Sequence, residues 1–289
     1  MPDLGLWPAR ASWFTVPLLA GPALAHSLSR HSTPVRLVAE VLLWGAWAVA
    51  FGASLVPRST SLTAFRALVP VGVVAAAWAT ADRGHLGAAE GVALAVTFVA
   101  LVAALLPITG EAFADGSSYG PERRMILRPP IWLVAGPIEV VWAVAVAGVA
   151  TGPLLLAARA WVAGGLAIAV GAPATWFTVR ALHQLSRRWV VFVPSGFVLH
   201  DPLATPEPHL FVRRMVARLG PAEAATDAVD LTGGAIGLAL EIDLTEPIEL
   251  FRRTARRGTA TEMVERVLFT PTRPAELLDE ARSRRIRVG

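Results

Sequence analysis

Long apolar runs fill the first two thirds of the chain. A transmembrane helix needs about 20 mostly apolar residues. None of the runs found here has a polar stripe at helical period, so none is typical of a soluble core helix. The pattern predicts a bundle of about five transmembrane helices over residues 37–180. Short polar or Gly/Pro breaks such as Thr151-Gly152-Pro153 separate the runs, which cover residues 37–56, 62–81, 88–108, 131–150 and 154–177.

The segment before these runs has a weaker pattern. Residues 13–28 are apolar, but they are few for a span and include Pro17 and Pro22. We predict that residues 1–36 form an N-terminal segment lying in the membrane interface. Two alternatives stay open, a sixth span and a signal peptide cleaved near Ala23-Leu24-Ala25.

From about residue 187 the apolar runs become short and alternating, with turn residues between them. This is typical of an antiparallel sheet. Residues 189–193 and 197–200 flank Pro194-Ser195-Gly196, which predicts a hairpin. Leu277, Leu278 and Ala281 repeat at helical spacing and predict a closing helix over 275–285. Residues 181–289 are therefore predicted to form an α+β domain, with further strands at 210–212, 215–219, 226–231, 235–243, 248–251 and 263–269.

The composition also indicates that one part of the chain lies in lipid and the other in water. Hydrophobic residues make up 54% of the 289 and charged residues 17%, with a mean hydropathy of +0.54, as expected for a membrane protein. Nine of the ten tryptophans lie at or before Trp176. All 26 basic residues are arginine and no cysteine is present, which excludes disulfides and thiolate chemistry. No aromatic-interleaved basic stripe indicates a nucleic-acid groove.

Arginine is distributed unequally between the predicted loops. Positively charged residues favour the cytoplasmic side of a membrane. With five spans, the richer face carries the C-terminal domain, so the domain is predicted to be cytoplasmic and the N-terminus outside. The richer face holds Arg58, Arg123, Arg124, Arg128, Arg180, Arg187 and Arg188, and the other chiefly Arg30, Arg36 and Arg83.

Two stretches of the C-terminal part, RRWVVFVPSGFVLHDP and VERVLFTPTRPAELLDEARSRRI, resemble bacterial pleckstrin-homology-like domains attached to membrane helices. The whole chain resembles an uncharacterised family of actinobacterial multi-pass membrane proteins. The resemblance implies an antiparallel sheet or split barrel capped by a C-terminal helix, and a location in the bacterial inner (plasma) membrane. It implies no catalytic residues.

Glu139 is the one acidic residue predicted near a bilayer midplane, about nine residues into the run 131–150. A charged side chain there costs about 2.5–3.5 kcal/mol. One interpretation is an ion or proton site in a transporter or channel component. The other is a protonated or hydrogen-bonded glutamate that only packs helices.

Two arginine-containing segments are candidates for binding anions. In the predicted loop 109–130, Ser117, Ser118 and Tyr119 offer hydroxyls and free backbone donors, and Arg123 and Arg124 offer charge, as a phosphate or lipid headgroup requires. The alternative is an ordinary cytoplasmic loop. The second segment, RRTARR, is either a contact for anionic lipid or a solvated loop, and it contains Arg252, Arg253, Arg256 and Arg257.

No pattern predicts catalysis. The six histidines show no metal-binding spacing, and Ser195, His200 and Asp201 lie around one hairpin with no nucleophile elbow. We expect no enzyme, metal or cofactor. The partners expected are the lipid bilayer, anionic lipid headgroups, or another membrane or cytoplasmic protein. The main hypothesis is a membrane-anchored interaction or lipid-contacting module, and the alternative is transport through Glu139.

Overall fold

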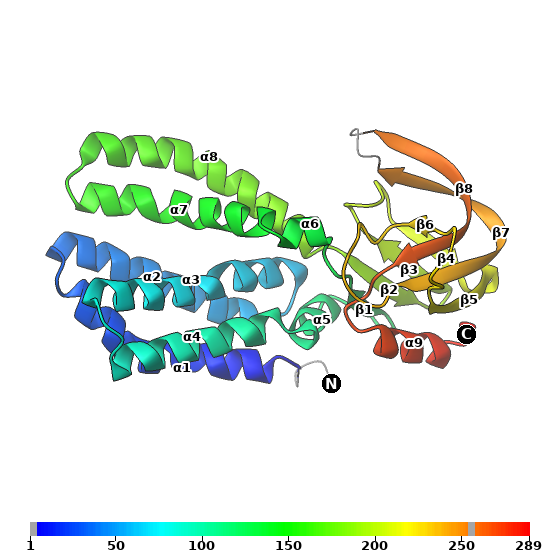
Figure 1. Cartoon of the computed structure of the whole chain (residues 1–289), viewed down its shortest axis with the longest axis horizontal. Helices are drawn as coiled ribbons and strands as arrows, with labels where there is room; N and C mark the ends of the chain where they lie inside the picture. Colours follow the sequence, from blue (N-terminus) through cyan, green and yellow to red (C-terminus); the bar gives the residue numbers. More distant parts are fainter. Residues whose placement is uncertain (1–4, 254–257) are drawn as a thin grey trace. The chain divides into compact units, whose positions relative to one another are not determined.

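The computed structural model describes residues 5–253 and 258–289, and the chain forms two compact units (Figure 1). The first, here called the helical unit, consists of Met1–Gly116 and Glu139–His183. The second, here called the sheet unit, consists of Ser117–Ile138 and Gln184–Gly289. The sequence predicts a single boundary near residue 181, whereas in the structure residues 117–138 also belong to the sheet unit.

Five helices in the described part of the chain are long and apolar enough to cross a membrane, which confirms the predicted multi-pass bundle. The first three lie close to the predicted runs. The last two are displaced toward the C-terminus from theirs. The five are α2 (Thr33–Leu55), α3 (Ser59–Arg83), α4 (Ala88–Leu105), α7 (Pro137–Ala157) and α8 (Trp161–Leu185).

The displacement of α7 begins at Gly136. The short helix α6 (Ile131–Val134) ends before it, and Gly136 has a φ of 139°. Glycine alone adopts such a φ without strain. Pro137 then begins α7, and proline favours the first turn of a helix. The predicted run 131–150 is therefore not one helix.

The end of α7 also differs from the prediction. Gly152 and Pro153 lie inside the helix rather than after it, and the turn into α8 contains Arg159, with a φ of 63°. Proline is tolerated inside membrane helices because neighbouring groups satisfy the freed backbone. Thr151-Gly152-Pro153 is therefore not a loop between spans.

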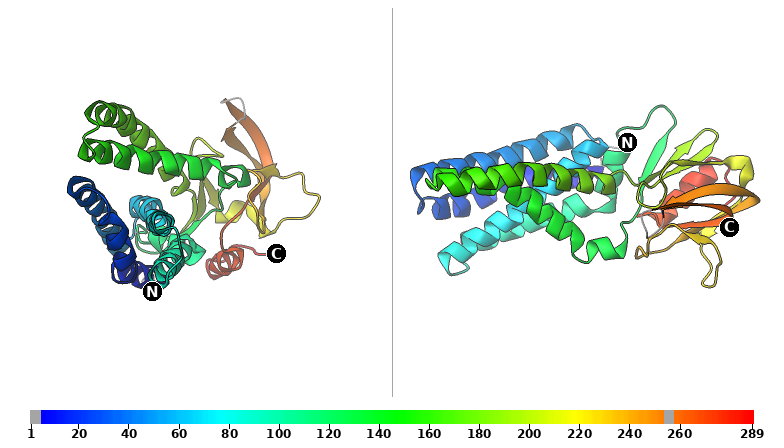
Figure 2. Two further views of the ribbon diagram at one scale, coloured as in Figure 1. Left: turned by 60° about the vertical axis from the view of Figure 1, so that its left-hand side comes forward. Right: turned by 90° about the horizontal axis from the view of Figure 1, so that it is seen from above.

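Glycines bring α7 and α8 into close contact, and the two helices lie side by side (Figures 1 and 2). A Cβ on Gly171 would lie 2.6 Å from the carbonyl oxygen of Gly148, and one on Gly152 would lie 3.3 Å from that of Gly164. Thr175 Oγ1 donates a hydrogen bond to the carbonyl of Ala145 at 3.2 Å. This is the small-residue packing typical of membrane helices, in which backbones approach closely.

The N-terminal segment forms a sixth long helix, α1 (Trp7–Leu28), that packs along α4 and contacts α2 and α3. Arg10 Nη2 donates to the carbonyl of Ser54, near the end of α2, at 2.7 Å. At the opposite end of α1, Ser27 Oγ donates to the carbonyl of Ala79 at 3.2 Å. Ala79 lies near the end of α3, so α1 runs parallel to α3; because Arg10 contacts the end of α2, α1 runs antiparallel to α2. Its 22 residues extend about 33 Å, which is long enough to cross a bilayer, but α1 is not among the helices that are also apolar enough. Its packing along α4 leads us to expect a sixth span rather than an interfacial segment.

This arrangement predicts on which side of the membrane the N-terminus lies. The chain lacks cysteine, so single cysteines can be introduced at Trp7, Tyr119 and His85, all exposed. If α1 crosses the bilayer, a membrane-impermeant maleimide should label Trp7→Cys and Tyr119→Cys from the same side, and His85→Cys from the other. Labelling of Trp7→Cys together with His85→Cys would show that α1 does not cross.

Half of the predicted loop 109–130 belongs to a helix or a strand. Its first part belongs to α5 (Pro107–Asp115), which packs in the helical unit with the ring of Phe113 5.6 Å from that of Phe65. Its second part contains β1 (Arg123–Ile126), which pairs antiparallel with β2. Pairing partners about 65 residues away in sequence explain why local pattern did not predict β1.

The sheet unit contains two four-stranded sheets and a final helix, which confirms the antiparallel-rich domain. The predicted hairpin is present, with Val193 opposite Gly196. β6 is much shorter than predicted, and it pairs in parallel with β8. One sheet has the order β1, β2 (Trp189–Val193), β3 (Gly196–His200) and β4 (His209–Val212). The other has the order β5 (Val216–Pro221), β7 (Leu240–Arg253), β8 (Thr259–Phe269) and β6 (Val229–Asp230).

One apolar core joins both sheets to α9 (Pro274–Ser283). Phe192 and Phe197 of the first sheet and Phe269 of the second are buried in it. α9 contributes Leu277 and Ala281, as its helical spacing predicts. β7 is one strand with an irregularity between Asp243 and Ile248, where the sequence predicts two strands. That strand carries its C-terminal end, with Arg252 and Arg253, to the site described next.

Candidate functional site

The structure separates the predicted anion-binding residues into two groups. Arg123 and Arg124 lie in β1, opposite Phe192 and Val191 of β2. Arg252 and Arg253 lie at the end of β7, paired with β8. Arg256 and Arg257 lie outside the described residues. The two segments therefore do not lie on neighbouring strands and belong to different sheets.

Arg124 interacts mainly within its own domain. Its guanidinium carbon lies 5.5 Å from the ring centroid of Trp189, within cation–π range. Its Nη2 is 3.5 Å from a carboxylate oxygen of Glu122. The charge of Arg124 is thus partly neutralised inside the sheet unit.

Ser117, Ser118 and Tyr119 precede β1 in a turn. Tyr119 is 81% exposed, and its backbone N–H lies 3.4 Å from Oε2 of Glu122, to which it donates. The carboxylate of Glu122 therefore accepts the backbone N–H of Tyr119 that the predicted site would offer to a phosphate. The phosphate site at Ser117–Tyr119 stays a prediction, with the Tyr119 N–H already donated to Glu122.

Glu139 lies in the first turn of α7, not nine residues into a span. The reason is the break at Gly136, which makes Pro137 the first residue of the helix. A carboxylate near a helix N-terminus is stabilised by the helix dipole. The alternative of transport through a midplane glutamate loses the position on which it depended.

A cavity of about 170 Å³ in the sheet unit collects residues from several elements. We call it the arginine cavity, because Arg188, Arg252 and Arg253 are among the residues that line it. Among the described residues that line it, Asp230 is the one carboxylate and Trp132 of α6 the one aromatic residue. The rest of the wall is formed by Pro130, Leu203, Ala204, Leu231 and Gly233.

Arg188 is fixed in place by a buried ion pair. Its Nε and Nη2 donate to the two carboxylate oxygens of Asp201 at 2.7 and 2.6 Å, and Nη1 donates to the carbonyl of Arg128 at 2.6 Å. The two side chains are 3% and 1% exposed. Such a bidentate pair is rigid, so Arg188 forms a fixed part of the cavity wall. Because Asp201 faces Arg188, its carboxylate is not available to His200.

The other two arginines are held more loosely. Arg252 Nε lies 2.9 Å from Oε2 of Glu262, and both side chains are more than 40% exposed. The backbone N–H of Arg253 donates to the carbonyl of Ala204 at 2.8 Å, which joins the end of β7 to the cavity wall. The side chain of Arg253 is exposed. Among the described residues, neither side chain has a buried ion pair like that of Arg188, so both can change rotamer at small cost, although successive side chains of a strand point to opposite faces.

Chain connectivity ties the arginine cavity to the membrane spans. Trp132 precedes Pro137, the first residue of α7, by five residues, and Arg188 follows Leu185, the last residue of α8, by three. At about 3.6 Å per residue at most, the chain allows about 18 and 11 Å between them. Two parts of the cavity wall thus lie within reach of the membrane surface, where tryptophan is enriched.

The sequence analysis identified Arg252 and Arg253 but not their neighbours in the cavity. Arg188 counted only as a loop charge, and Trp132 as part of an apolar run. The doublet Arg187-Arg188 directly before a β-strand, together with Asp201 after the next strand, was the available signal, because strands of a hairpin bring such ends together.

His200 adds no charge near this region at neutral pH. Burial, and then the nearby charge of Arg187, lower the pKa of His200 below its ordinary value of 6.5. Its ring packs 5.2 Å from that of Trp189. The positive charge beside the cavity therefore comes from arginine.

No protein-family model, curated protein or solved structure matches this chain.

Proposed function

We propose that this protein is a membrane-anchored, non-catalytic module whose sheet unit binds anionic phospholipid headgroups at the arginine cavity. The observation that carries the proposal is the position of that cavity. Three arginines and one aspartate line it, and Trp132 and Arg188 lie five and three residues from membrane spans. At the membrane surface, the phosphates of the lipid headgroups are the most concentrated anions. Each arginine near an anionic leaflet contributes about 1 kcal/mol of attraction.

One residue of the cavity wall supports a lipid rather than a soluble anion. Trp132 lines the cavity and is 60% exposed. An amphipathic indole at headgroup level contributes favourable contact with the interface. A soluble phosphate would gain nothing from that side chain.

The proposal places the sheet unit in the cytoplasm at the bacterial inner membrane. With α1 as a sixth span, the N-terminus would lie on the side of the sheet unit, and Arg10 would join Arg58, Arg180 and Arg187 on that side. The other side has Arg30, Arg36, Arg83 and Arg159. Because Arg123, Arg124, Arg128 and Arg188 add to the first group, the arginine excess favours a cytoplasmic sheet unit.

The proposal also includes a pleckstrin-homology-like fold and membership of the actinobacterial multi-pass family. Two antiparallel-rich sheets closed by a C-terminal helix support the fold assignment. The parallel pairing of β6 with β8 is the feature that departs from a purely antiparallel design.

Neutral replacements at the end of β7 test the proposal. In the full chain in detergent, Arg252→Gln with Arg253→Gln is expected to weaken binding of short-chain phosphatidylglycerol by about 2 kcal/mol, on the order of thirtyfold. Short-chain phosphatidylcholine serves as the uncharged comparison, and isothermal titration measures both. Binding should also weaken with added salt.

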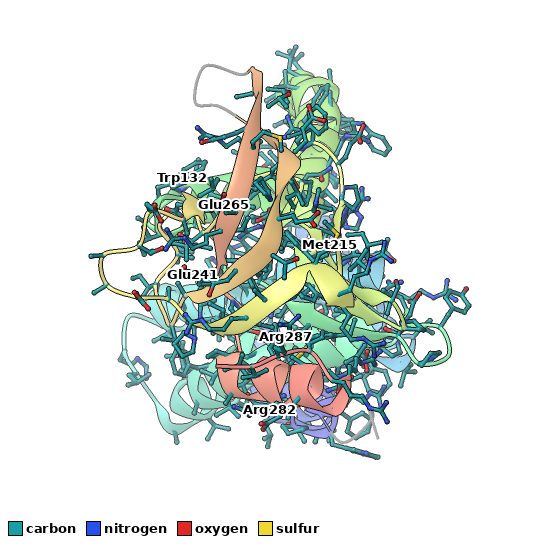
Figure 3. All side chains as sticks on the ribbon, turned by 90° about the vertical axis from the view of Figure 1, so that its right-hand side faces the viewer. Trp132, Met215, Glu241, Glu265, Arg282 and Arg287 are labelled. Atoms are coloured by element: carbon teal, nitrogen blue, oxygen red, sulfur yellow. The ribbon has the colours of Figure 1, made fainter. Side chains whose placement is uncertain are left out.

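The control removes two charges from elsewhere on the sheet unit. Arg282 lies on α9, away from Trp132 (Figure 3), and Arg214 is exposed. Arg214→Gln with Arg282→Gln should therefore bind phosphatidylglycerol as the parent chain does. Equal loss in the two double variants would mean that only net charge matters, and would refute a site at the arginine cavity.

A further inference from the structure

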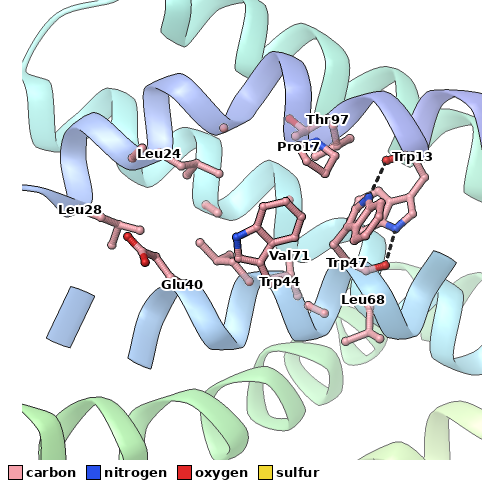
Figure 4. Close-up of a pocket in the computed structure, with 17 residues that line it drawn as sticks. Trp13, Pro17, Leu24, Leu28, Glu40, Trp44, Trp47, Leu68, Val71 and Thr97 are labelled. Carbon is pink, nitrogen blue, oxygen red and sulfur yellow. Dashed lines mark hydrogen bonds between the residues drawn. The ribbon is translucent and has the colours of Figure 1, made fainter. Parts of the chain in front are cut away.

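A second cavity, of about 330 Å³, lies in the helical unit between α1, α2, α3 and α4 (Figure 4). We call it the tryptophan cavity, because Trp13, Trp44 and Trp47 line it together with apolar residues such as Leu24, Leu68 and Val71. Its volume falls at the lower end of the range for small-molecule sites. Three of the four helices around it are long and apolar enough to cross a membrane, so its surroundings are lipid chains rather than water.

One end of the cavity is closed by a fixed structure. Trp13 Nε1 donates to the carbonyl of Trp47 and Trp47 Nε1 donates to the carbonyl of Trp13, both at 3.1 Å. This reciprocal pair satisfies both indole N–H groups and both carbonyls across α1 and α2. The wall at this end therefore presents apolar ring faces.

The other end contains a carboxylate. Glu40 lines the cavity near Leu28 (Figure 4). Within the described part of the chain, Glu40 forms no side-chain hydrogen bond and one ion pair, with Arg36 Nε at 3.7 Å; the two side chains are 42% and 41% exposed. Glu40 is the eighth residue of α2, about 10 Å along the helix. A charge at that depth favours a further partner.

We propose that the tryptophan cavity binds a membrane-dissolved amphiphile with a single alkyl chain and a cationic amine head. The chain would occupy the apolar volume next to the tryptophans, and the ammonium group would donate to the carboxylate of Glu40. A ligand of this class reaches the cavity from the bilayer. An anionic head of the same length would meet Glu40 with like charge, so the geometry selects the amine.

Glycines supply the variants for a test. Gly21 lines the cavity, and a Cβ there would meet nothing within 4 Å. Gly21→Leu therefore fills the cavity without a backbone clash. Gly45 of α2 has the same freedom but is not part of the cavity wall. Gly45→Leu is the matched control for added volume and helix propensity.

The experiment measures quenching of tryptophan fluorescence in nanodiscs by a bromine-labelled dodecylamine, with bromine-labelled dodecanoate as the anionic counterpart. In the parent chain and in Gly45→Leu, the amine should quench at lower concentration than the carboxylate. Gly21→Leu should abolish the saturable component. Glu40→Gln should weaken the amine about tenfold, as expected for a lost hydrogen bond to a charged group.

Two results would overturn the proposal. Equal quenching in Gly21→Leu and Gly45→Leu would show that the amphiphile only partitions into the bilayer near exposed tryptophans. Equal saturable quenching by amine and carboxylate would show that the cavity binds alkyl chains without selecting the charge of the headgroup. Glu40 would then have no part in binding.

Discussion

Replacing Asp201 by asparagine is expected to lower the free energy of unfolding of the sheet unit by about 3–5 kcal/mol. The substitution keeps the shape of the side chain but leaves the guanidinium of Arg188 buried without a counter-charge. Arg188 and Asp201 are 3% and 1% exposed and joined by two hydrogen bonds of 2.7 and 2.6 Å. Most of the loss comes from the uncompensated charge rather than from the missing bond.

An exposed ion pair in the same unit provides the control. Arg282 Nη1 lies 2.6 Å from Oδ1 of Asp279, with side chains 58% and 72% exposed. Asp279→Asn should cost at most about 1 kcal/mol. Chemical denaturation of the full chain in micelles, followed by hydrogen exchange in β2 and β3, measures both variants. Equal effects would show that burial does not determine the cost.

Replacing both members of the ion pair tests whether the loss of stability comes from the unpaired charge of Arg188. Arg188→Met with Asp201→Leu should recover most of the loss, because apolar residues of similar volume replace buried ion pairs with little net cost. If the double variant remained as unstable as Asp201→Asn, the pair would be required for reasons other than charge compensation.

Gly171→Ala is expected to destabilise the packing of α7 against α8 by about 1–3 kcal/mol. A Cβ at this position would lie 2.6 Å from the carbonyl oxygen and 2.9 Å from the Cα of Gly148. Both atoms belong to the backbone, so no side-chain rotation relieves the overlap. The two helices must separate, and the contacts along the whole seam weaken.

Gly165→Ala on the same helix is the matched control, because a Cβ there meets nothing within 4 Å. It should leave packing unchanged. Spin labels on cysteines replacing Val149 and Val170, both exposed, report the distance between the helices in a chain without native cysteine. A longer distance is expected in Gly171→Ala only, and an unchanged distance there would contradict the packing account.

The existence of the spans could be predicted from sequence, but two of their boundaries could not. Apolar length alone indicates a helix that crosses a membrane. It does not show whether Gly152-Pro153 ends a helix, because proline interrupts helices in water and is tolerated in lipid. The glycine contacts between α7 and α8 depend on which faces meet, and periodicity does not specify that.

In the sheet unit, too, the elements formed by residues close in sequence could be predicted, and those formed by distant residues could not. The β2–β3 hairpin was predictable, because its turn and alternation lie within a dozen residues. β1 was not, because its partner strand lies about 65 residues away. Arg188 was missed as a site residue for a related reason. Its burial depends on Asp201 and the carbonyl of Arg128, and neither contact follows from composition.

The most direct test of the proposed function uses phosphatidylglycerol with a photoreactive headgroup in nanodiscs that hold the parent chain. After irradiation, mass spectrometry locates the adducts. Binding at the arginine cavity predicts adducts on peptides containing Trp132, Arg188 and Arg252–Arg253, reduced by excess unlabelled phosphatidylglycerol but not by phosphatidylcholine. Adducts concentrated on α9, or unchanged by the anionic competitor, would contradict the proposal.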